Sequence, residues 1–424
     1  MPYVINKHGE PLMPCSPRKA RQLLNTGKAR VKTRTPFTIQ LVNGASGYKQ
    51  PVILGVDAGS KTIGLSAATK HQELFAAEAT PRNDVVELLS TRREQRRARR
   101  NRTTRYRKPR FNNRTHSKHR GWLAPSIEVK IQEQITLIKR VCTILPISKI
   151  VAETAEFDLQ KLKAIELGMP VPVGEDYQKG EMLGSYNVRQ YVLFRDNYTC
   201  QCCKAHGKGV KLHVHHRETR KTGGNAPDNL ITLCDLCHGA IHSGKIAMPA
   251  VLRRASRSTR DATFMGIMRK MLIIRLESEL LIPIQETHGY VTKYTRVELL
   301  KIPKTHANDA LAIAMGRDGF NVSILHCVQR SRIYHIKAVR HHNRQLHKCT
   351  ILKGGVRKSN QAPKYVKGFR LFDKVRYRGQ ECFIWGRRAA GNCLLKSLDG
   401  TKIKDGANCK HLALLERSSN YLIA

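Results

Sequence analysis

Apolar and polar positions in the first part of the chain predict short β-strands separated by helices. Apolar, β-branched runs predict strands at residues 4–6, 37–42, 51–56, 63–67, 74–79 and 147–152. The runs at 51–56 and 63–67 are joined by a short turn containing Gly59, which indicates a β-hairpin. A helix is expected from Pro17 to Asn25, with Ser16 as its cap. Strands and helices in this order are typical of a mixed α/β protein.

Helical periodicity is clearest between Pro125 and Cys142, where apolar residues recur at intervals of three and four. Further helices are expected from residue 83 onward, over residues 263–273 and from His306 to Met315, whereas residues 289–294 are strand-like. From Phe369 onward, short β-prone runs alternate with glycine turns. The strands predicted there cover residues 374–377, 381–385 and 392–398. This last segment is expected to fold as a small β-rich module.

The composition points to a polyanionic partner. The chain has 424 residues, with 76 Lys and Arg against 32 Asp and Glu, which gives a formal net charge of +44. This length suits roughly two to four domains. Self-repulsion of so many cations opposes compaction, so DNA or RNA is the expected partner. An anionic membrane is the competing explanation, but no apolar run is long enough to span a bilayer.

The cysteine pattern and the N-terminus predict an intracellular location. Four of the 12 cysteines form two Cys-x-x-Cys pairs and the others are scattered. This is a metal-binding pattern of a reducing compartment rather than a disulfide framework. The N-terminal residues are polar and do not fit a signal peptide. We therefore expect the protein in the cytoplasm or nucleoid of a prokaryotic cell.

An arginine block follows the first predicted strands, and only Glu94 opposes its charge. Its arginines are Arg92, Arg93, Arg96, Arg97, Arg99, Arg100, Arg102, Arg105, Arg107 and Arg110. A solvated or disordered basic tract is one interpretation. We favour a second, a helix with arginine on every side, because few helix-breaking residues interrupt the run. Such a helix has no face to bury in a core and would be stabilised by surrounding phosphates.

Two cysteine pairs predict a structural zinc site. Cys200 and Cys203 form one pair, and Cys234 and Cys237 form the other. Four thiolates in two tight pairs are a typical tetrahedral zinc set. Cys202 lies within the first pair and is expected to point away. Chance pairing is the alternative, but a histidine-rich segment lies between the pairs.

That segment resembles the zinc-containing HNH endonucleases, which have a ββα-metal fold. The likeness covers residues 186–245 and rests on Leu212-His-Val-His-His216, Asn229 and Cys237-His238. It implies that His216 is the general base, that His215 and His238 bind one catalytic Mg²⁺, and that Asn229 orients the base. Many members have Asp where this chain has His215, which makes the site softer. His242 is either a further ligand or a structural residue, and we favour the latter; His213 is expected to be an ordinary strand residue.

Three carboxylates far apart in sequence predict a second site. Asp57 and Glu153 each end an apolar strand, and Asp309 lies at the start of a helix. Any one of them alone would be read as a cap or a surface acid. Glu156 competes with Glu153, but Glu153 follows the strand directly.

Together the three carboxylates resemble those of the RuvC branch of the RNase H-like nucleases, in which such carboxylates converge. Converging carboxylates repel one another unless cations lie between them, so the resemblance implies two Mg²⁺ about 3.5–4 Å apart. His306 precedes Asp309 by one helical turn and is a candidate base.

The order of these segments resembles that of the IscB nucleases, which are encoded by insertion sequences and related to type II CRISPR effectors. Its marks are Pro11 to Pro14, the Val56-Asp57-Ala58-Gly59 segment, the arginine helix and the HNH insertion; many members have Pro at the position of Ala58. The implied architecture is an α/β multidomain protein whose RNase H-like (RuvC) domain is split in three. The implied segments are an N-terminal basic domain (1–48), RuvC part I (49–90), an arginine-rich bridge helix (91–120), RuvC part II (121–180), HNH (186–245), RuvC part III (260–325), and a basic linker with a β-rich C-terminal domain (326–424).

The resemblance implies an RNA-guided DNA endonuclease that acts as one protein monomer with a structured guide RNA, the ωRNA. HNH would cut the guide-paired strand of double-stranded DNA, and RuvC would cut the displaced strand. The C-terminal domain would read a target-adjacent motif, because arginine is the usual reader of guanine edges. Its candidates are Arg376, Arg378, Arg387 and Arg388.

Three other functions compete with this one. A protein-only endonuclease would need no RNA, but it has little use for an arginine helix between nuclease segments. A nucleic-acid-binding protein with inactive sites would not need the full set of acids and histidines that the chain retains. A zinc-finger transcription factor leaves the three carboxylates unexplained.

Overall fold

The structure is a computed structural model that describes residues 1–44, 46–101, 121–154, 188–207, 209–218, 227–249, 260–316, 331–340 and 363–424. It divides into two compact units. The first comprises residues 1–107, 125–156 and 268–424, and the second, residues 108–124 and 157–267, is inserted into it. Among the described residues, every helix is too short or too polar to cross a membrane.

The N-terminal residues form a small four-stranded sheet with one helix. Its elements are β1 (Tyr3–Ile5), β2 (Pro11–Leu12), α1 (Pro17–Asn25), β3 (Ala29–Thr33) and β4 (Thr38–Leu41), and the strand order is β2-β1-β4-β3. Helix α1 begins as predicted, because the Ser16 hydroxyl accepts a hydrogen bond from the backbone N–H of Lys19 (3.2 Å) and Pro17 occupies the first turn. Ala20 of α1 packs with Val4 and Ile39 of the sheet.

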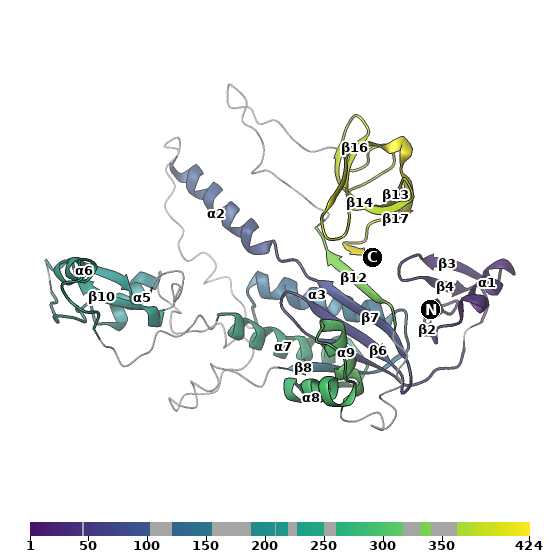
Figure 1. The fold of residues 1–424 in the computed structure, drawn as a ribbon, viewed down its shortest axis with the longest axis horizontal. Helices are drawn as coiled ribbons and strands as arrows, with labels where there is room; N and C mark the ends of the chain where they lie inside the picture. Colours follow the sequence, from purple (N-terminus) through teal and green to yellow (C-terminus); the bar gives the residue numbers. More distant parts are fainter. Residues whose placement is uncertain are drawn as a thin grey trace. The chain divides into compact units, whose positions relative to one another are not determined.

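A seven-stranded sheet is the centre of the first unit (Figure 1). Its strands are β5 (Val52–Asp57), β6 (Ile63–Ala68), β7 (Glu73–Thr80), β8 (Ile147–Thr154), β11 (Ile284–His288), β12 (Ile333–Ala338) and β18 (Tyr421–Ile423). The strand order is β11-β8-β5-β6-β7-β12-β18. The first three strands in sequence form an antiparallel meander, which includes the predicted hairpin. Strands β8 and β11 then add in parallel beside β5.

Helices cover both faces of this sheet. Residues Ile53, Gly55 and Asp57 of β5 share one face, on which helix α9 (His306–Met315) lies. Leu54 and Val56 point to the other face, where helix α3 (Pro125–Cys142) buries its apolar stripe. Helices α2 (Val85–Asn101), α7 (Arg260–Glu279) and α8 (Gly289–Tyr294) and the π-helical turn η3 (Thr295–Leu299) also occur in the described part of residues 85–299.

The prediction of a strand at residues 289–294 was wrong, because these residues form helix α8. The strand lies just before them, over Ile284–His288, and pairs with β8. The aromatic and β-branched residues of α8 suggested a strand, but tertiary packing overrides this weak preference. Thr292 is buried and its hydroxyl donates to the His288 carbonyl (3.4 Å), one helical turn earlier.

The second unit contains a two-stranded sheet framed by helices. Its elements are α5 (Val188–Arg195), β9 (Leu212–His216), the 3₁₀ turn η2 (Pro227–Asn229), β10 (Leu230–Cys234) and α6 (Asp235–His242). Strands β9 and β10 are antiparallel, and His215 lies opposite Ile231. Ile231 and Leu233 pack against Cys200, Cys234 and Cys237, so these three cysteines are part of the core of this unit.

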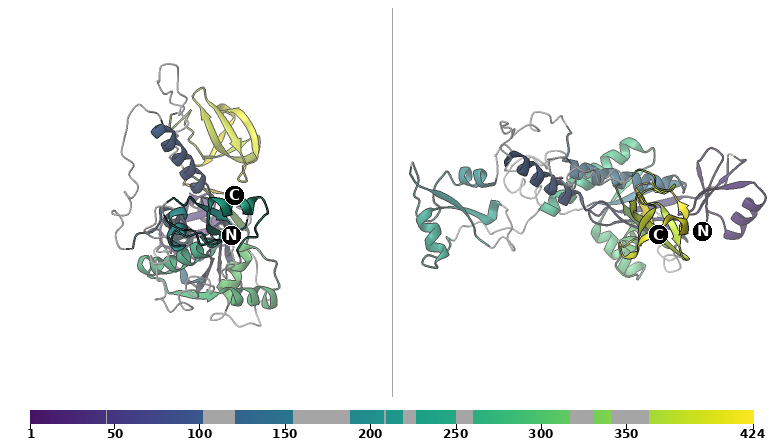
Figure 2. Two further views of the ribbon diagram at one scale, coloured as in Figure 1. Left: turned by 90° about the vertical axis from the view of Figure 1, so that its left-hand side faces the viewer. Right: turned by 90° about the horizontal axis from the view of Figure 1, so that it is seen from above.

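The C-terminal residues form a five-stranded antiparallel sheet (Figure 2). Its elements are β13 (Lys374–Tyr377), β14 (Gln380–Arg388), β15 (Asn392–Lys396), β16 (Lys402–Asn408), the turn η6 (Cys409–His411) and β17 (Ala413–Glu416), in the order β16-β15-β14-β13-β17. Strands β12 and β18 come from the same stretch of chain but belong to the large sheet. The predicted mixed α/β, multidomain organisation is confirmed.

Candidate functional sites

The three predicted carboxylates lie together at one edge of the large sheet. Asp57 ends β5, and Glu153 lies near the end of the neighbouring parallel strand β8. Asp309 lies in the first turn of α9, whose N-terminus is at the same edge. Asp57 is buried, and the side chains of Glu153 and Asp309 are each 16% exposed. Glu156, the alternative to Glu153, lies outside the described residues.

Two glycines allow α9 to approach the sheet closely enough to form this cluster. Gly64 lies opposite Asp57 in the β5–β6 pair, and a Cβ atom on it would be 2.0 Å from the His306 carbonyl oxygen. A Cβ on Gly55 would be 2.0 Å from the Ala310 carbonyl oxygen. Only glycine lets the backbones meet in this way. The glycines therefore set the position of the first turn of α9.

Mutual repulsion and burial characterise this acidic cluster. Burial raises the pKa of Glu153, and the charges of Asp57 and Asp309 raise it further. Burial likewise raises the pKa of Asp309, with Asp57 adding to the effect. The hydrogen bond between His306 Nδ1 and Asp57 Oδ2 (2.6 Å) raises the pKa of the His306 imidazole. Such shifts indicate a group of acids that a cation would stabilise.

Two arginines partly offset the negative charge. Arg296 Nε lies 2.7 Å from Asp309 Oδ1, and Arg269 Nη2 lies 3.6 Å from Glu153 Oε1. Both arginine side chains are largely buried. Sequence reasoning missed them, because they are scattered single residues whose positions only the fold brings together. Carboxylate oxygens are the donors that Mg²⁺ prefers, so these residue types suit a hard divalent cation.

The four predicted cysteines of the second unit form one cluster. The sulfur atoms of Cys200, Cys203, Cys234 and Cys237 all lie within 4.8 Å of one another. The Cys203 and Cys234 sulfurs are 3.6 Å apart. Zn–S bonds of about 2.3 Å in a tetrahedron place sulfurs about 3.8 Å apart, so the cluster fits zinc.

The local backbone favours a thiolate at Cys200. Burial opposes ionisation of this thiol, but backbone N–H groups of Cys203, Cys234 and Cys202 outweigh it and lower the Cys200 pKa to about 6. Backbone N–H groups that point at sulfur stabilise the charged form, which is the form that binds metal.

Three histidines form a second candidate metal group, and they include His242. The ring nitrogens of His215, His238 and His242 lie within 4.8 Å of one another. His238 and His242 are four residues apart on α6 and therefore share a face. The sequence favours a structural role for His242, whereas the structure brings its ring together with the other two. Three imidazoles suit Zn²⁺ or Ni²⁺ better than Mg²⁺.

His213, which the sequence predicts to be an ordinary strand residue, contacts this group through His238. Its ring stacks on that of His238, with centroids 4.7 Å apart and planes at 14°. Its Nε2 lies 2.7 Å from Asp235 Oδ1 at the start of α6. His213 and His215 share a face of β9, because side chains two apart along a strand point the same way. His213 therefore fixes the orientation of the His238 ring.

His216 and Asn229 lie beside this group. His216 is the last residue of β9 and does not belong to the group of three. Asn229 is fully buried, and its side chain accepts from the Glu218 N–H (2.8 Å) and donates to the Glu218 carbonyl (3.2 Å). These bonds hold the backbone two residues after His216. Asn229 therefore fixes the segment that carries the predicted base.

The predicted arginine contacts are distributed over two regions. Arg92, Arg93, Arg96, Arg97, Arg99 and Arg100 lie on α2, where Arg92 and Arg93 are exposed, whereas Arg102, Arg105, Arg107 and Arg110 are outside the described residues. Arg376 and Arg378 are exposed at one end of the β13–β14 hairpin.

The other two C-terminal arginines lie at the far end of β14. Arg388 pairs with Asp405 (2.9 Å), and Arg387 is half-buried and bonds to the Lys364 carbonyl. Arg376 of β13 lies opposite Glu381 of β14, and Glu381 precedes Arg387 by six residues along β14. At about 3.3 Å per residue this separation is about 20 Å, so the four arginines do not form one patch.

Comparisons with known proteins agree with part of these assignments. Residues 3–180 match the family described as RRXRR protein, and residues 200–244 match the HNH endonuclease family. No curated protein matches the sequence. The crystal structure of Streptococcus thermophilus Cas9 in complex with AGGA PAM is similar over 45% of this chain and 26% of that chain, with 10% identity and a TM-score of 0.28. This last likeness is too low to carry an argument.

The HNH match covers the part of the second unit that holds both of its residue clusters. Residues 200–244 are an HNH endonuclease domain, and they contain the four-cysteine cluster and the histidine group. A nuclease domain implies a nucleic-acid substrate and phosphodiester hydrolysis. The charge of +44 fits such a substrate.

Proposed function

We propose that the protein is an RNA-guided DNA endonuclease with two separate active sites, related to the IscB nucleases. The observation that carries this proposal is the coexistence of an HNH domain with a second, independent cluster of converging carboxylates. One metal-dependent site suffices to cut one strand. Two sites of different chemistry in one chain suit an enzyme that cuts both strands of a duplex, one with each site.

The strand order supports an RNase H-like (RuvC) assignment for the first site. Strands β5, β6 and β7 form an antiparallel meander, and β8 and β11 follow in parallel to β5, which gives the order β11-β8-β5-β6-β7. The carboxylates of Asp57 and Glu153 lie on β5 and β8. Asp57, Glu153 and Asp309 would hold two Mg²⁺, which would neutralise phosphate charge and lower the pKa of bound water. His306 Nδ1 bonds to Asp57, which leaves Nε2 to accept a proton from the attacking water.

In the HNH domain, we assign His216 as the general base. His215, His238 and His242 would hold one divalent cation, which would stabilise charge on the phosphate and the leaving oxygen. Asn229 keeps the backbone after His216 in place, and His213 orients His238. The four cysteines would bind a structural zinc ion that joins the start of the domain to α6.

The guide RNA is assigned from charge and from the segment order. Helix α2 carries a run of arginines with few acids to neutralise them, and a phosphate backbone would do so. Exposed Arg376 and Arg378 are the better candidates for reading a target-adjacent motif, because Arg387 and Arg388 already have protein partners. Guide pairing would then select the DNA sequence.

Co-purified nucleic acid tests guidance. The protein would be expressed beside its native flanking DNA, purified at high salt, and its bound nucleic acid sequenced. One dominant structured RNA with a variable end is the expected result, and this RNA should direct cleavage of a matching duplex. Recovery of no RNA, or of random fragments only, would overturn guidance and leave a protein-only endonuclease. Cleavage of linear and branched DNA with a divalent cation would then test that alternative.

A further inference from the structure

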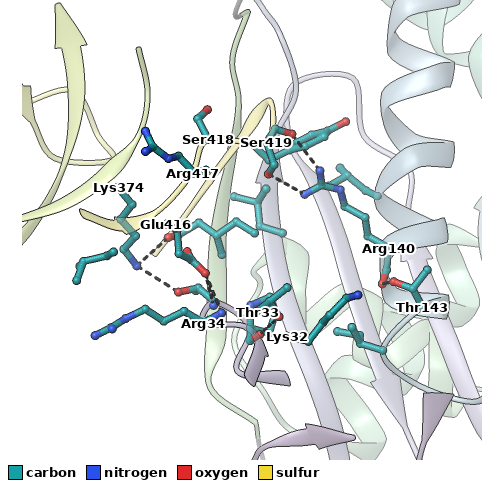
Figure 3. A pocket seen from close by; sticks show the side chains of 18 of the residues that line it. Lys32, Thr33, Arg34, Arg140, Thr143, Lys374, Glu416, Arg417, Ser418 and Ser419 are labelled. Atoms are coloured by element: carbon teal, nitrogen blue, oxygen red, sulfur yellow. Dashed lines mark hydrogen bonds between the residues drawn. The ribbon is translucent and has the colours of Figure 1, made fainter. Parts of the chain in front are cut away.

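A cavity of about 570 Å³ lies in the first unit (Figure 3), and none of its lining residues belongs to either candidate active site. Its walls come from β3 and the turn after it, from the second half of α3, and from residues 415–423. Glu416 joins two of these walls, because its Oε1 accepts from the backbone N–H groups of Arg34 (2.9 Å) and Thr35 (2.7 Å). Strand β18 pairs with β12 of the large sheet, and this pairing holds the wall made by residues 415–423 in place.

The cavity wall carries more cations than carboxylates. Five cationic side chains line it, namely Lys32, Arg34, Arg140, Lys374 and Arg417, and Glu416 is the one carboxylate among its lining residues. That carboxylate is already bonded to two backbone amides. Arg34 and Lys374 both pair with Glu381 (3.8 and 2.9 Å), and Arg417 pairs with Asp373 (2.9 Å). Among the described residues, Lys32 and Arg140 are the lining cations without such a carboxylate, so they are the two that can bind an added anion.

Arg140 is the cation whose surroundings most clearly require an anion. Its guanidinium is half-buried and donates to the Ser419 carbonyl (3.0 Å) and, at 3.5 Å, to the Ser419 hydroxyl. Among the described residues, no carboxylate forms an ion pair with it, and burial lowers its pKa. Its Cζ lies 4.4 Å from the centroid of the Tyr421 ring. A half-buried cation with only neutral partners is destabilising unless an anion joins it.

The interior of the cavity is apolar and aromatic. Leu65 and Phe75 of the sheet, Phe372 and Phe383 of the C-terminal domain, and Tyr421 line it. An arginine beside a tyrosine ring is a common platform for a nucleobase, because bases stack on aromatic rings and on guanidinium planes. A volume of about 570 Å³ is also within the range of about 300–1,000 Å³ that is usual for ligand sites.

We propose that this cavity binds one unpaired nucleotide of a single-stranded nucleic-acid segment. Arg140 and Lys32 would contact its phosphate, and its base would lie against the apolar interior beside Tyr421. A paired nucleotide would not fit, because its partner strand would have to enter the cavity as well. The inference goes beyond the proposed function, since none of these residues belongs to either nuclease site.

Photocrosslinking of the full chain tests this proposal. The probe is a single-stranded RNA that contains 4-thiouridine, and crosslinked peptides are identified by mass spectrometry. We expect a crosslink within residues 415–423 or at Phe372, which falls at least threefold in Arg140→Gln and persists in the charge-matched surface variant Lys402→Gln. Crosslinks confined to other peptides, or equal yields in the two variants, would overturn it. So would an equal cavity crosslink with a fully double-stranded probe.

A second readout covers the possibility that Arg140→Gln perturbs the fold. Lys32→Gln removes a charge from an exposed residue of β3, on a different wall of the cavity from Arg140. The slope of log Kd against log salt for the single-stranded RNA should fall by about 0.7 in this variant, as expected for one lost phosphate contact. An unchanged slope with unchanged crosslinking would overturn the proposal. Neither readout depends on DNA cleavage, so failure of the guided-nuclease proposal would be seen separately.

Discussion

The backbone contact between α9 and the sheet predicts a selective loss of activity in Gly64→Ala. Gly64 lies opposite Asp57, and the carbonyl of His306 passes directly over it. A methyl group at this position would be 2.0 Å from that carbonyl oxygen. The obstacle is backbone rather than a flexible side chain, so the first turn of α9 must move.

The size of the movement can be estimated from the structure. Cβ atoms essentially never come within 3.0 Å of such an atom, so α9 must shift by about 1 Å or more. This shift moves His306 and Asp309 relative to Asp57 and Glu153. A misplacement of about 1 Å can cost on the order of 10²-fold in rate. We therefore expect displaced-strand cleavage to slow about 100-fold.

The assay uses a duplex with a different fluorophore on each strand. Paired-strand cleavage by the HNH domain should persist, and it reports that the variant is folded and loaded. Gly239→Ala is the matched control, because a Cβ on this helical glycine has no atom within 4 Å. Its displaced-strand cleavage should equal that of the wild type. Wild-type displaced-strand cleavage by Gly64→Ala would refute the role of α9 in this site.

Three further predictions concern the HNH domain. Cys234→Ser should release zinc, measured by elemental analysis, and abolish paired-strand cleavage while RNA stays bound; a fully active wild-type preparation without zinc would contradict this. His242→Ala should slow paired-strand cleavage at least tenfold, whereas the exposed His206→Ala should not, and equal rates in the two variants would return His242 to a structural role. Because three imidazoles favour borderline ions, Ni²⁺ should support paired-strand cleavage better than Mg²⁺ at equal concentration, and the reverse preference would be evidence against this ligand set.

Much of the fold could be predicted because its signals are local. Helices α1 and α9 have the predicted bounds, since a Ser cap and a Thr305 cap mark their first residues. The cysteine pairs likewise indicate their own cluster, because each pair is a short sequence motif. The roles assigned to the HNH histidines and Asn229 come from the resemblance and stay predictions; only the grouping of His215 and His238 with His242 is a finding of the structure.

What the sequence did not indicate depends on contacts between distant segments. Gly55 and Gly64 have no local role that marks them, and only the packing of α9 explains them. Arg269 and Arg296 reach the acidic cluster from separate helices. Residues 289–294 form a helix rather than the predicted strand, because the residues just before them, Ile284–His288, already pair with β8.

The central claim, that two sites each cut one strand, is tested most directly by two single variants. With the RNA recovered from the protein and a doubly labelled matching duplex, the products of Asp57→Ala and His216→Ala would be resolved strand by strand. We predict that Asp57→Ala cuts only the guide-paired strand and that His216→Ala cuts only the displaced strand, so each variant nicks. Loss of both cuts in either variant, or both cuts in either variant, would contradict the account.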